Sequence, residues 1–215
     1  MNREIEFLNQ ITVNAHSSVR IETGGKVLYV DPFKLTEAPL DADVIFFTHS
    51  HFDHFSPEDV EKLRKADTVF VLPETMASEA AQTTAGHRVV MLSPSARGLV
   101  EGIEFETVPA YNPAKPFHPR ANGWVGYVLT VEGLRVYIAG DTDATEESMA
   151  VRCDIAMLPI GGKYTMDPAE AADLANLIRP RVVIPIHYGS VAGCPKDFKR
   201  FASRVDRSIV VHQVI

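Results

Sequence analysis

The chain has 215 residues, and its hydrophobic content of 46% is enough to bury a substantial core. A formal charge of −7 disfavours the basic surface that a nucleic-acid backbone requires. The first residues form no apolar leader, and no stretch approaches the about 18 consecutive apolar residues that cross a bilayer. The two cysteines are too few for a disulfide framework. We therefore expect one domain over residues 1–215, cytoplasmic and acting on a small molecule, with its oligomeric state left open.

Strands dominate the predicted elements, because ten apolar runs are rich in β-branched residues. In chain order these runs are Lys26–Val30, Val44–Phe47, Thr68–Leu72, Arg88–Leu92, Ile103–Val108, Trp124–Val131, Leu134–Ala139, Ile155–Leu158, Val182–Ile186 and Ser208–Val211. Several of them are continuously apolar, which indicates that both faces of a sheet are covered. This pattern favours an α/β fold of the αββα sandwich type, with helices outside two sheets.

Two helices carry explicit start signals. Ser56 and Asp167 are each followed directly by proline, and an acidic residue stands three positions after each of them. This pattern is typical of a capped helix N-terminus. The first helix is expected to reach about Ala66, and the second to end before Pro180. Weaker helical patterns cover Glu74–Gln82, Glu146–Val151 and Lys196–Arg204.

Four of the predicted strands run directly into a residue that can bind metal. These residues are Asp31, His49, Asp141 and His187. A single polar residue after a strand is more often a turn or cap residue. In layered α/β folds, however, sites assemble from loops at the carboxyl ends of strands, so the recurrence predicts that the four converge.

The six residues from His49 to His54 read His-Ser-His-Phe-Asp-His. In an extended chain, His49 and His51 lie on the same side and can reach one ion. A turn after them would direct Asp53 and His54 toward a second ion. Mixed imidazole and carboxylate ligands suit zinc, manganese or iron, whereas the alternative is a surface loop that happens to contain histidines.

Three segments together resemble the metallo-β-lactamase superfamily in order and spacing over nearly the whole chain: Thr48–His54, Ala139–Thr142 and Ile184–Tyr188. The segment Pro159–Met166 is similar to small metal-dependent hydrolases related to ascorbate-6-phosphate lactonase and, more distantly, to N-acyl phosphatidylethanolamine phospholipase D. The resemblance implies two mixed sheets flanked by helices. It also implies a binuclear centre, with zinc preferred over manganese or iron.

In that centre, the resemblance assigns one ion to His49, His51 and a third histidine, the other ion to Asp53, His54 and His187, and a bridging position to Asp141. We expect the third histidine to be His118, on a proline-rich loop, and not His87, which reads as an exposed turn.

Two further residues are expected to support the centre without binding metal. Asp31 matches an acid that orients the metal-binding histidines by hydrogen bonding. His16 matches the histidine of a Gly-His pair, although Ala15 replaces the glycine, so a purely structural role for His16 stays open. His212 is expected to be structural.

Two ions can share a hydroxide that attacks an ester, lactone, thioester, amide or phosphodiester, with Asp53 and Asp141 as catalytic residues. Asp53 would orient the hydroxide and pass a proton to the leaving group. Because two carboxylates do not neutralise two divalent ions, we expect a small anionic substrate. The expected substrate-binding residues are Lys115, Arg120, Lys163 and Tyr188. The alternative is a non-catalytic metal-binding protein, such as a sensor or an assembly factor.

Overall fold

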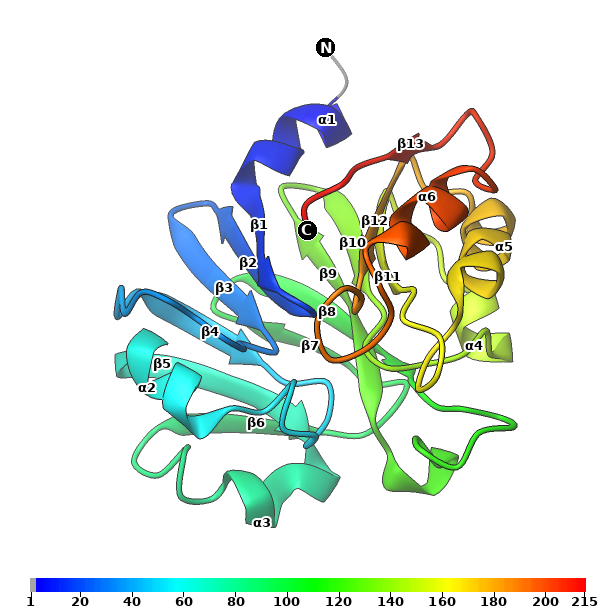
Figure 1. Ribbon diagram of the computed structural model, residues 1–215. Helices are drawn as coiled ribbons and strands as arrows, with labels where there is room; N and C mark the ends of the chain where they lie inside the picture. Colours follow the sequence, from blue (N-terminus) through cyan, green and yellow to red (C-terminus); the bar gives the residue numbers. More distant parts are fainter. Residues whose placement is uncertain (1–2) are drawn as a thin grey trace.

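The computed structural model describes residues 3–215, in which the strands form two mixed sheets (Figure 1). The first sheet has, in spatial order, β1 (Ile11–Ala15), β2 (Ser18–Thr23), β3 (Lys26–Val30), β4 (Ala42–Phe46), β5 (Arg64–Pro73) and β6 (Arg88–Leu92). The second sheet has β13 (Val210–Val211), β12 (Val182–Ile186), β11 (Ile155–Pro159), β10 (Leu134–Ile138), β9 (Val125–Val131), β8 (Ile103–Pro109) and β7 (Arg97–Val100). The strands β3 to β6 are mutually parallel, as are β10 to β13, and the remaining pairs are antiparallel.

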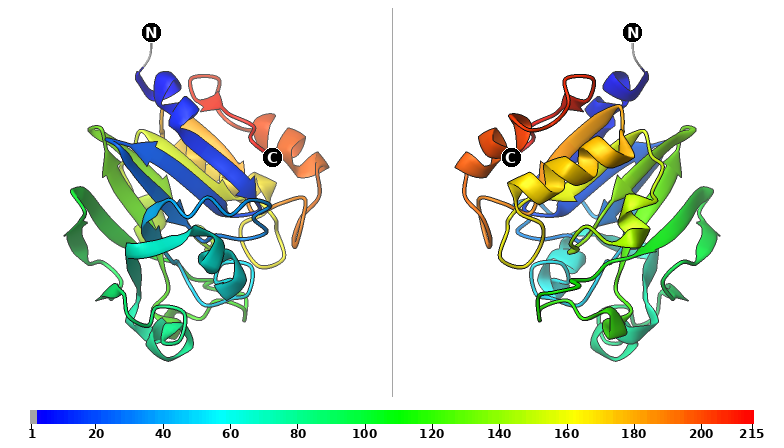
Figure 2. Two further views of the ribbon diagram at one scale, coloured as in Figure 1. Left: turned by 90° about the vertical axis from the view of Figure 1, so that its left-hand side faces the viewer. Right: turned by 90° about the vertical axis from the view of Figure 1, so that its right-hand side faces the viewer.

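Helices cover the outer face of each sheet (Figures 1 and 2). The first sheet packs against α2 (Pro57–Leu63) and α3 (Ala77–Ala80), and the second against α4 (Glu146–Met149), α5 (Pro168–Ile178) and α6 (Lys196–Ala202). A short helix, α1 (Arg3–Phe7), precedes β1. None of the helices within residues 3–215 is long and apolar enough to cross a membrane.

Strand β4 shows why the predicted strands read as continuous apolar runs. Val44 and Phe46 pack into the core between the sheets, whereas Ile45 and Phe47 pack into the core beneath α2 and α3. In the second sheet, Val136 of β10 faces the core between the sheets, while Tyr137 packs into the core beside the helices. Both faces of the central strands are therefore buried, and the predicted αββα architecture is confirmed.

The local predictions fail mainly at element ends and at the sheet edges. The helix predicted to reach Ala66 ends at Leu63, because Arg64 takes an extended backbone and pairs with Ala42 of β4. Strands β1, β2 and β7 were not predicted. They are antiparallel strands at or near the sheet edges, and their alternating exposure gives a weaker apolar signal than a continuous run.

The weaker helices are all shorter than expected. The segment Glu74–Gln82 divides into a 3-10 turn, Glu74–Met76, and α3, and the two remaining patterns end at Met149 and Ala202. The last predicted strand reduces to Val210–Val211.

The cap of α5 is formed as the sequence predicts, and it fixes the loop that leads from β11 toward the site. The Asp167 carboxylate accepts from the backbone N–H of Ala169 (2.7 Å) and Glu170 (2.9 Å). The Glu170 carboxylate in turn accepts from the Asp167 N–H at 2.9 Å, which completes a capping box with Pro168 at the first helical position.

Replacing this cap should lower stability without touching the core. We expect Asp167→Ala to lower the free energy of unfolding of the metal-free protein by about 1 kcal/mol, since two backbone donors lose their acceptor. Urea titration measures the change. Asp173→Ala, which removes an exposed acid from the same helix, is the control and should leave the midpoint nearly unchanged. Equal losses in both variants would contradict a specific capping effect.

Candidate metal centre

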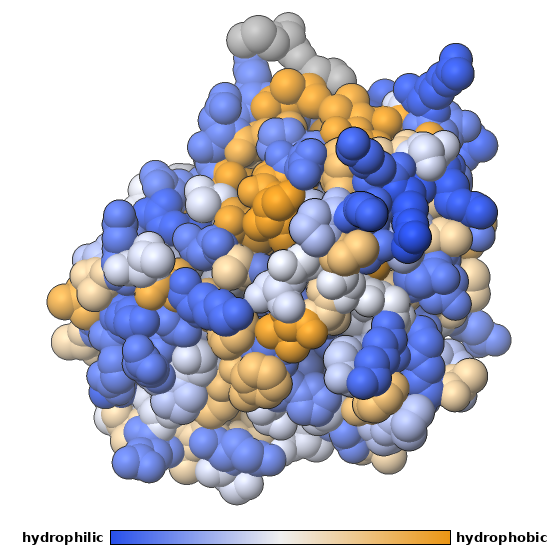
Figure 3. All heavy atoms as spheres, viewed as in Figure 1, coloured by the Kyte–Doolittle hydropathy of each residue, from blue (hydrophilic) through white to orange (hydrophobic). Residues whose placement is uncertain are grey.

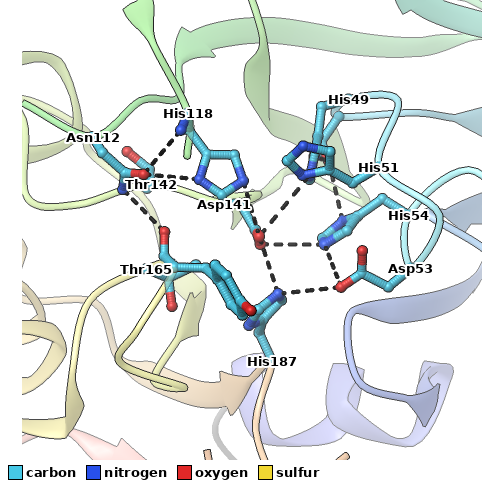
Figure 4. A network of polar contacts seen from close by, with 12 residues as sticks. His49, His51, Asp53, His54, Asn112, His118, Asp141, Thr142, Thr165 and His187 are labelled. Atoms are coloured by element: carbon cyan, nitrogen blue, oxygen red, sulfur yellow. Dashed lines mark hydrogen bonds and ion pairs between the residues drawn. The ribbon is translucent and has the colours of Figure 1, made fainter. Parts of the chain in front are cut away.

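The four strands expected to deliver polar residues do bring them to one place. Asp31 follows β3, His49 follows β4, Asp141 follows β10 and His187 follows β12. All four side chains are buried, with exposed fractions of 4% or less. Figure 4 shows residues from both sheets directed toward a common centre at the edge of the sandwich.

A first group of donors contains His49, His51 and His118, whose ligand atoms all lie within 4.8 Å of one another. Nε2 of His49 is 3.1 Å from Nδ1 of His51. His118 reaches the group from the long loop between β8 and β9 and is buried. His87 is not part of it, because its Nε2 lies 3.2 Å from the carbonyl of Lys65 instead.

A second group contains Asp53, His54, His187 and His16, again with ligand atoms within 4.8 Å of one another. The Asp53 Oδ2 atom is 3.7 Å from Nε2 of His187 and 3.8 Å from Nε2 of His54. His16, from the turn between β1 and β2, places its Nε2 3.2 Å from the same oxygen. The structure therefore brings His16 beside Asp53, whether it supports that carboxylate or binds metal itself.

Asp141 lies between the two groups (Figure 4). Its Oδ2 atom is 3.3 Å from Nε2 of His118, 3.0 Å from Nε2 of His187 and 4.0 Å from Nε2 of His49. Its Oδ1 atom is 3.3 Å from Nε2 of His54. A carboxylate in this position can contact a cation in either group.

Several of these buried atoms have no hydrogen-bond partner among residues 3–215. They are Nε2 of His54, His118 and His187, both ring nitrogens of His16, Nδ1 of His187, and Oδ1 of Asp141. Buried polar atoms are seldom left unsatisfied, because losing their hydration costs free energy. Divalent cations would satisfy most of them, so the residues fit two metal ions.

Asp31 fixes which ring nitrogen His49 and His54 present to the centre. Its carboxylate accepts from the Thr48 N–H (2.8 Å), from the Thr48 hydroxyl (2.6 Å) and from Nδ1 of His54 (2.7 Å). Because the Thr48 hydroxyl donates its proton to Asp31, it accepts from Nδ1 of His49 at 2.9 Å. Both histidines therefore keep Nε2 free for a metal ion.

Asn112 orients His118 in the same way, and sequence reasoning missed it. The Asn112 Oδ1 atom lies 2.8 Å from Nδ1 of His118 and also accepts from the His118 N–H. Its amide nitrogen donates to the carbonyl of Tyr164 at 3.1 Å. An asparagine beside a proline in a loop carries no sequence signal for such a role. Thr48, by contrast, lies within the quoted motif and could have been singled out.

Burial and charge shift the pKa values of His49 and His54 in opposite directions. Burial lowers the pKa of His49 well below its usual value, so its imidazole is neutral and ready to bind metal. Burial also acts to lower the pKa of His54, but the carboxylates of Asp141 and Asp31 outweigh it and raise that pKa. Asp141 keeps a depressed pKa, because the charges of His187 and His54 outweigh its burial. A cation in the second group would therefore displace protons from imidazoles.

Three of the site residues hold the backbone in the left-handed region. The φ angles are 48° for Asp31, 55° for His16 and 56° for His187, a conformation that costs free energy in residues other than glycine. The backbone around His187 is also crowded. A Cβ atom on Gly161 would lie 2.3 Å from the His187 carbonyl oxygen, so only glycine fits there.

The centre opens into a cavity of about 250 Å³. Its lining residues are His51, Phe52, Asp53, Phe117, His118, Asp141, Tyr164, His187 and Val191. Donors from both groups therefore reach the same space, and four apolar or aromatic side chains complete its wall.

The structure does not bring the four expected substrate-binding residues into this lining. The Lys115 amine donates to Asp143 (2.5 Å) and to the carbonyl of Thr165 (2.7 Å), which holds the loop in place. Arg120 pairs with Glu147 at 2.5 Å. Proximity to His118 in sequence therefore does not bring these cations into the lining, and their role in substrate binding stays a prediction.

Lys163 and Tyr188 are also placed elsewhere. Lys163 is exposed, and its amine lies over the ring of Tyr164, 4.9 Å from the centroid. Tyr188 is buried in the core beside α5 and α6, and its hydroxyl donates to the carbonyl of Ile215 at 2.7 Å. Each of the two is adjacent in sequence to a lining residue, Lys163 to Tyr164 and Tyr188 to His187, but neither lines the cavity itself.

Comparison with known proteins identifies the class of molecule. Residues 10–187 match the family described as Beta-lactamase superfamily domain, so the chain is a member of the metallo-β-lactamase superfamily. A UPF0173 metal-dependent hydrolase from Thermococcus onnurineus (strain NA1) is 31% identical over 201 residues, covering 86% of this chain and 88% of its own. The chain belongs to this UPF0173 family of metal-dependent hydrolases.

Solved structures agree with the fold. A protein from Parabacteroides distasonis ATCC 8503, assigned to the metal-dependent hydrolases, superposes with a TM-score of 0.81 and is 30% identical, covering 94% of this chain and 91% of its own. A protein from Thermotoga maritima, assigned as a Zn-dependent hydrolase of the superfamily, has a TM-score of 0.63 and 22% identity, covering 94% and 97%. The narrower resemblance to ascorbate-6-phosphate lactonase stays a prediction.

Removing one histidine from each donor group should lower the metal content. We expect protein resupplied with zinc, manganese or iron to hold up to two ions per chain, and His49→Ala and His54→Ala each to lose about one. Metal analysis of folded, buffer-exchanged protein measures the ratio. His87→Ala removes a histidine outside both groups and should keep the full content. A full complement in both site variants would refute the two-group arrangement.

Asp31→Asn should weaken metal binding without removing a ligand. An amide has one acceptor oxygen where the carboxylate uses two, so either the Thr48 N–H, or the Thr48 hydroxyl together with Nδ1 of His54, faces an NH2 donor, and the support for the His54 tautomer that presents Nε2 is weakened. Metal affinity, measured by competition with a chromophoric chelator, should fall about 10- to 100-fold. Asparagine tolerates the left-handed backbone, so the fold should persist. Unchanged affinity would mean that Asp31 does not orient the donors.

Proposed function

We propose that this chain is a binuclear metal-dependent hydrolase of a small ester, lactone or phosphodiester. The observation that carries the proposal is the position of Asp141 between two donor groups at the base of an open cavity. In the proposed centre, one ion is bound by His49, His51 and His118, the other by Asp53, His54 and His187, and Asp141 contacts both. Asp31 and His16 support these ligands.

Zinc is the preferred metal, with manganese or iron as alternatives. The donor set of imidazoles and carboxylates suits all three ions. The Zn-dependent assignment of the Thermotoga maritima protein supports zinc only as far as a shared fold can.

Two divalent ions, when bound, would lower the pKa of a shared water toward neutrality and polarise the substrate oxygen. The carboxylates of Asp53 and Asp141 both border the cavity, and we assign the proton to Asp53 because Asp141 lies between the two donor groups. Nε2 of His16, which is itself buried, lies 3.2 Å from the Asp53 Oδ2 atom. We assign Asp53 the transfer of a proton to the leaving group. Within residues 3–215, the cavity lining includes no serine or cysteine, so no covalent intermediate with these residue types is needed.

Among the possible substrates we favour a lactone or carboxylic ester, on the resemblance of Pro159–Met166 to ascorbate-6-phosphate lactonase. An anionic substituent is compatible with this choice. The metal ions themselves would attract such an anion, because Lys115 and Arg120 are already paired with carboxylates.

A non-catalytic metal-binding protein of the same fold is the competing function. A metal that served only structure would need no access to a ligand, whereas donors of both groups line an open cavity here. Fold alone does not decide between the two, so turnover must.

Asp141→Asn should abolish turnover while leaving the fold intact. We expect metal-loaded protein to hydrolyse members of a panel of lactones, esters and phosphodiesters, and to stop when a chelator is added. The substitution removes the charge between the two groups at nearly constant volume, so kcat/KM should fall at least about a hundredfold.

Asp143→Asn is the matched control, since Asp143 follows two residues later but pairs with Lys115. It should keep both metal content and activity. If wild-type protein bound two ions yet turned over nothing on the panel, the non-catalytic function would be favoured.

A further inference from the structure

The wall of the cavity above the donor groups is aromatic and apolar, and the proposed function does not yet use it. Phe52, Phe117, Tyr164 and Val191 form this wall. Phe52 has 69% of its surface exposed, although it stands between two donors in sequence. Figure 3 shows apolar residues reaching the surface near the centre of this side of the molecule, among hydrophilic neighbours.

The wall is held by the same contacts that place the donors. The carbonyl of His51 accepts from the N–H groups of His54 (2.9 Å) and Phe55 (2.8 Å), and this turn carries Phe52 outward while its neighbours point inward. Phe117 directly precedes His118. An apolar group resting on these rings would therefore have a defined position relative to the ions.

Tyr164 is tied to the centre through one side chain. Asn112 donates to the Tyr164 carbonyl at 3.1 Å and accepts from His118 at 2.8 Å. The rings of Phe117 and Tyr164 meet edge to face, with centroids 4.7 Å apart and an interplanar angle of 79°. Paired rings of this kind form a preorganised surface on which a further ring can pack.

The size of the cavity limits what it can accept. Its volume is about 250 Å³, whereas an apolar cavity of about 150 Å³ is enough to bind benzene. One six-membered ring and an attached ester group therefore fill the available space, with the ester over the donors. Within residues 3–215, the lining contains no lysine or arginine, although the exposed amine of Lys163 lies 4.9 Å from the centroid of the Tyr164 ring.

We propose that the substrate carries an aromatic ring next to its hydrolysable group, and that Phe52, Phe117, Tyr164 and Val191 bind this ring. The inference rests on the proposed function and specifies its substrate class. The ring gains free energy by leaving water and by packing against other rings, and the donors remain free to act on the ester.

Two esters that differ only in the ring test the proposal. Methyl phenylacetate and methyl acetate share the ester bond and the leaving group. We expect metal-loaded protein to prefer methyl phenylacetate by at least about tenfold in kcat/KM, which is within the range of a single apolar contact site. Phe52→Ala and Tyr164→Ala should each lower this ratio about threefold or more, whereas Tyr164→Phe, which keeps the ring, should preserve it.

Leu99→Ala is the control for these truncations, since Leu99 is 63% exposed on β7 and outside the cavity. It should keep the wild-type ratio and rate. A ratio near one in the wild-type protein, or a ratio that none of the wall substitutions lowers, would overturn the proposal.

Binding of the product acids separates this inference from the proposed function. Calorimetric titration of metal-loaded protein should show phenylacetate binding at least about tenfold more tightly than acetate, with the difference reduced by Phe52→Ala. Tighter binding of phenylacetate without hydrolysis of either ester would support the aromatic site and contradict the hydrolase proposal. Hydrolysis of the esters with equal affinities for the two acids would support the hydrolase proposal and contradict the aromatic site. Failure of both acids to bind would also overturn the aromatic site.

Discussion

The hydrogen bonds of Asp31 are the constraint on which the candidate centre depends. A fully buried carboxylate is costly unless it finds hydrogen-bond partners, and burial raises the pKa of Asp31 even against the opposing effect of those partners. Thr48 and His54 supply those partners. Through these hydrogen bonds Asp31 orients His54 directly, and it orients His49 through the Thr48 hydroxyl. One side chain that does not line the cavity thus determines which nitrogen one histidine of each donor group, His49 or His54, presents.

The fold explains why such a polar cluster can exist inside an apolar sandwich. The core between the sheets is built from apolar side chains of the strands, and the buried histidines and aspartates of the centre lie beyond the ends of the parallel strands. There, Asp31 follows β3 in one sheet, while Asp141 and His187 follow β10 and β12 in the other. The two sheets therefore share one edge at which loops from both meet, and the helices stay on the outer faces, away from it.

Sequence reasoning succeeded where a residue's position follows from a strand and failed where it follows from a side chain's local partner. The convergence of Asp31, His49, Asp141 and His187 could be predicted, because parallel strands deliver their ends to one edge. The direction of Lys115 could not, since a flexible amine turns toward whichever acceptor is near, here Asp143. Asn112 was missed for a related reason. Its role depends on a loop conformation that no spacing encodes.

Asn112 also links reactivity to substrate selection. It holds His118 on one side and the backbone of Tyr164 on the other, so a change at Asn112 disturbs a proposed ligand and the cavity wall together. Phe52 differs, because its ring is mostly exposed and only its backbone belongs to the turn that places the donors. The side chain at this position can change size without moving a donor atom. A substitution at Phe52 can therefore change substrate specificity alone, whereas a change at Tyr164 also affects the position of the proposed metal ligand His118.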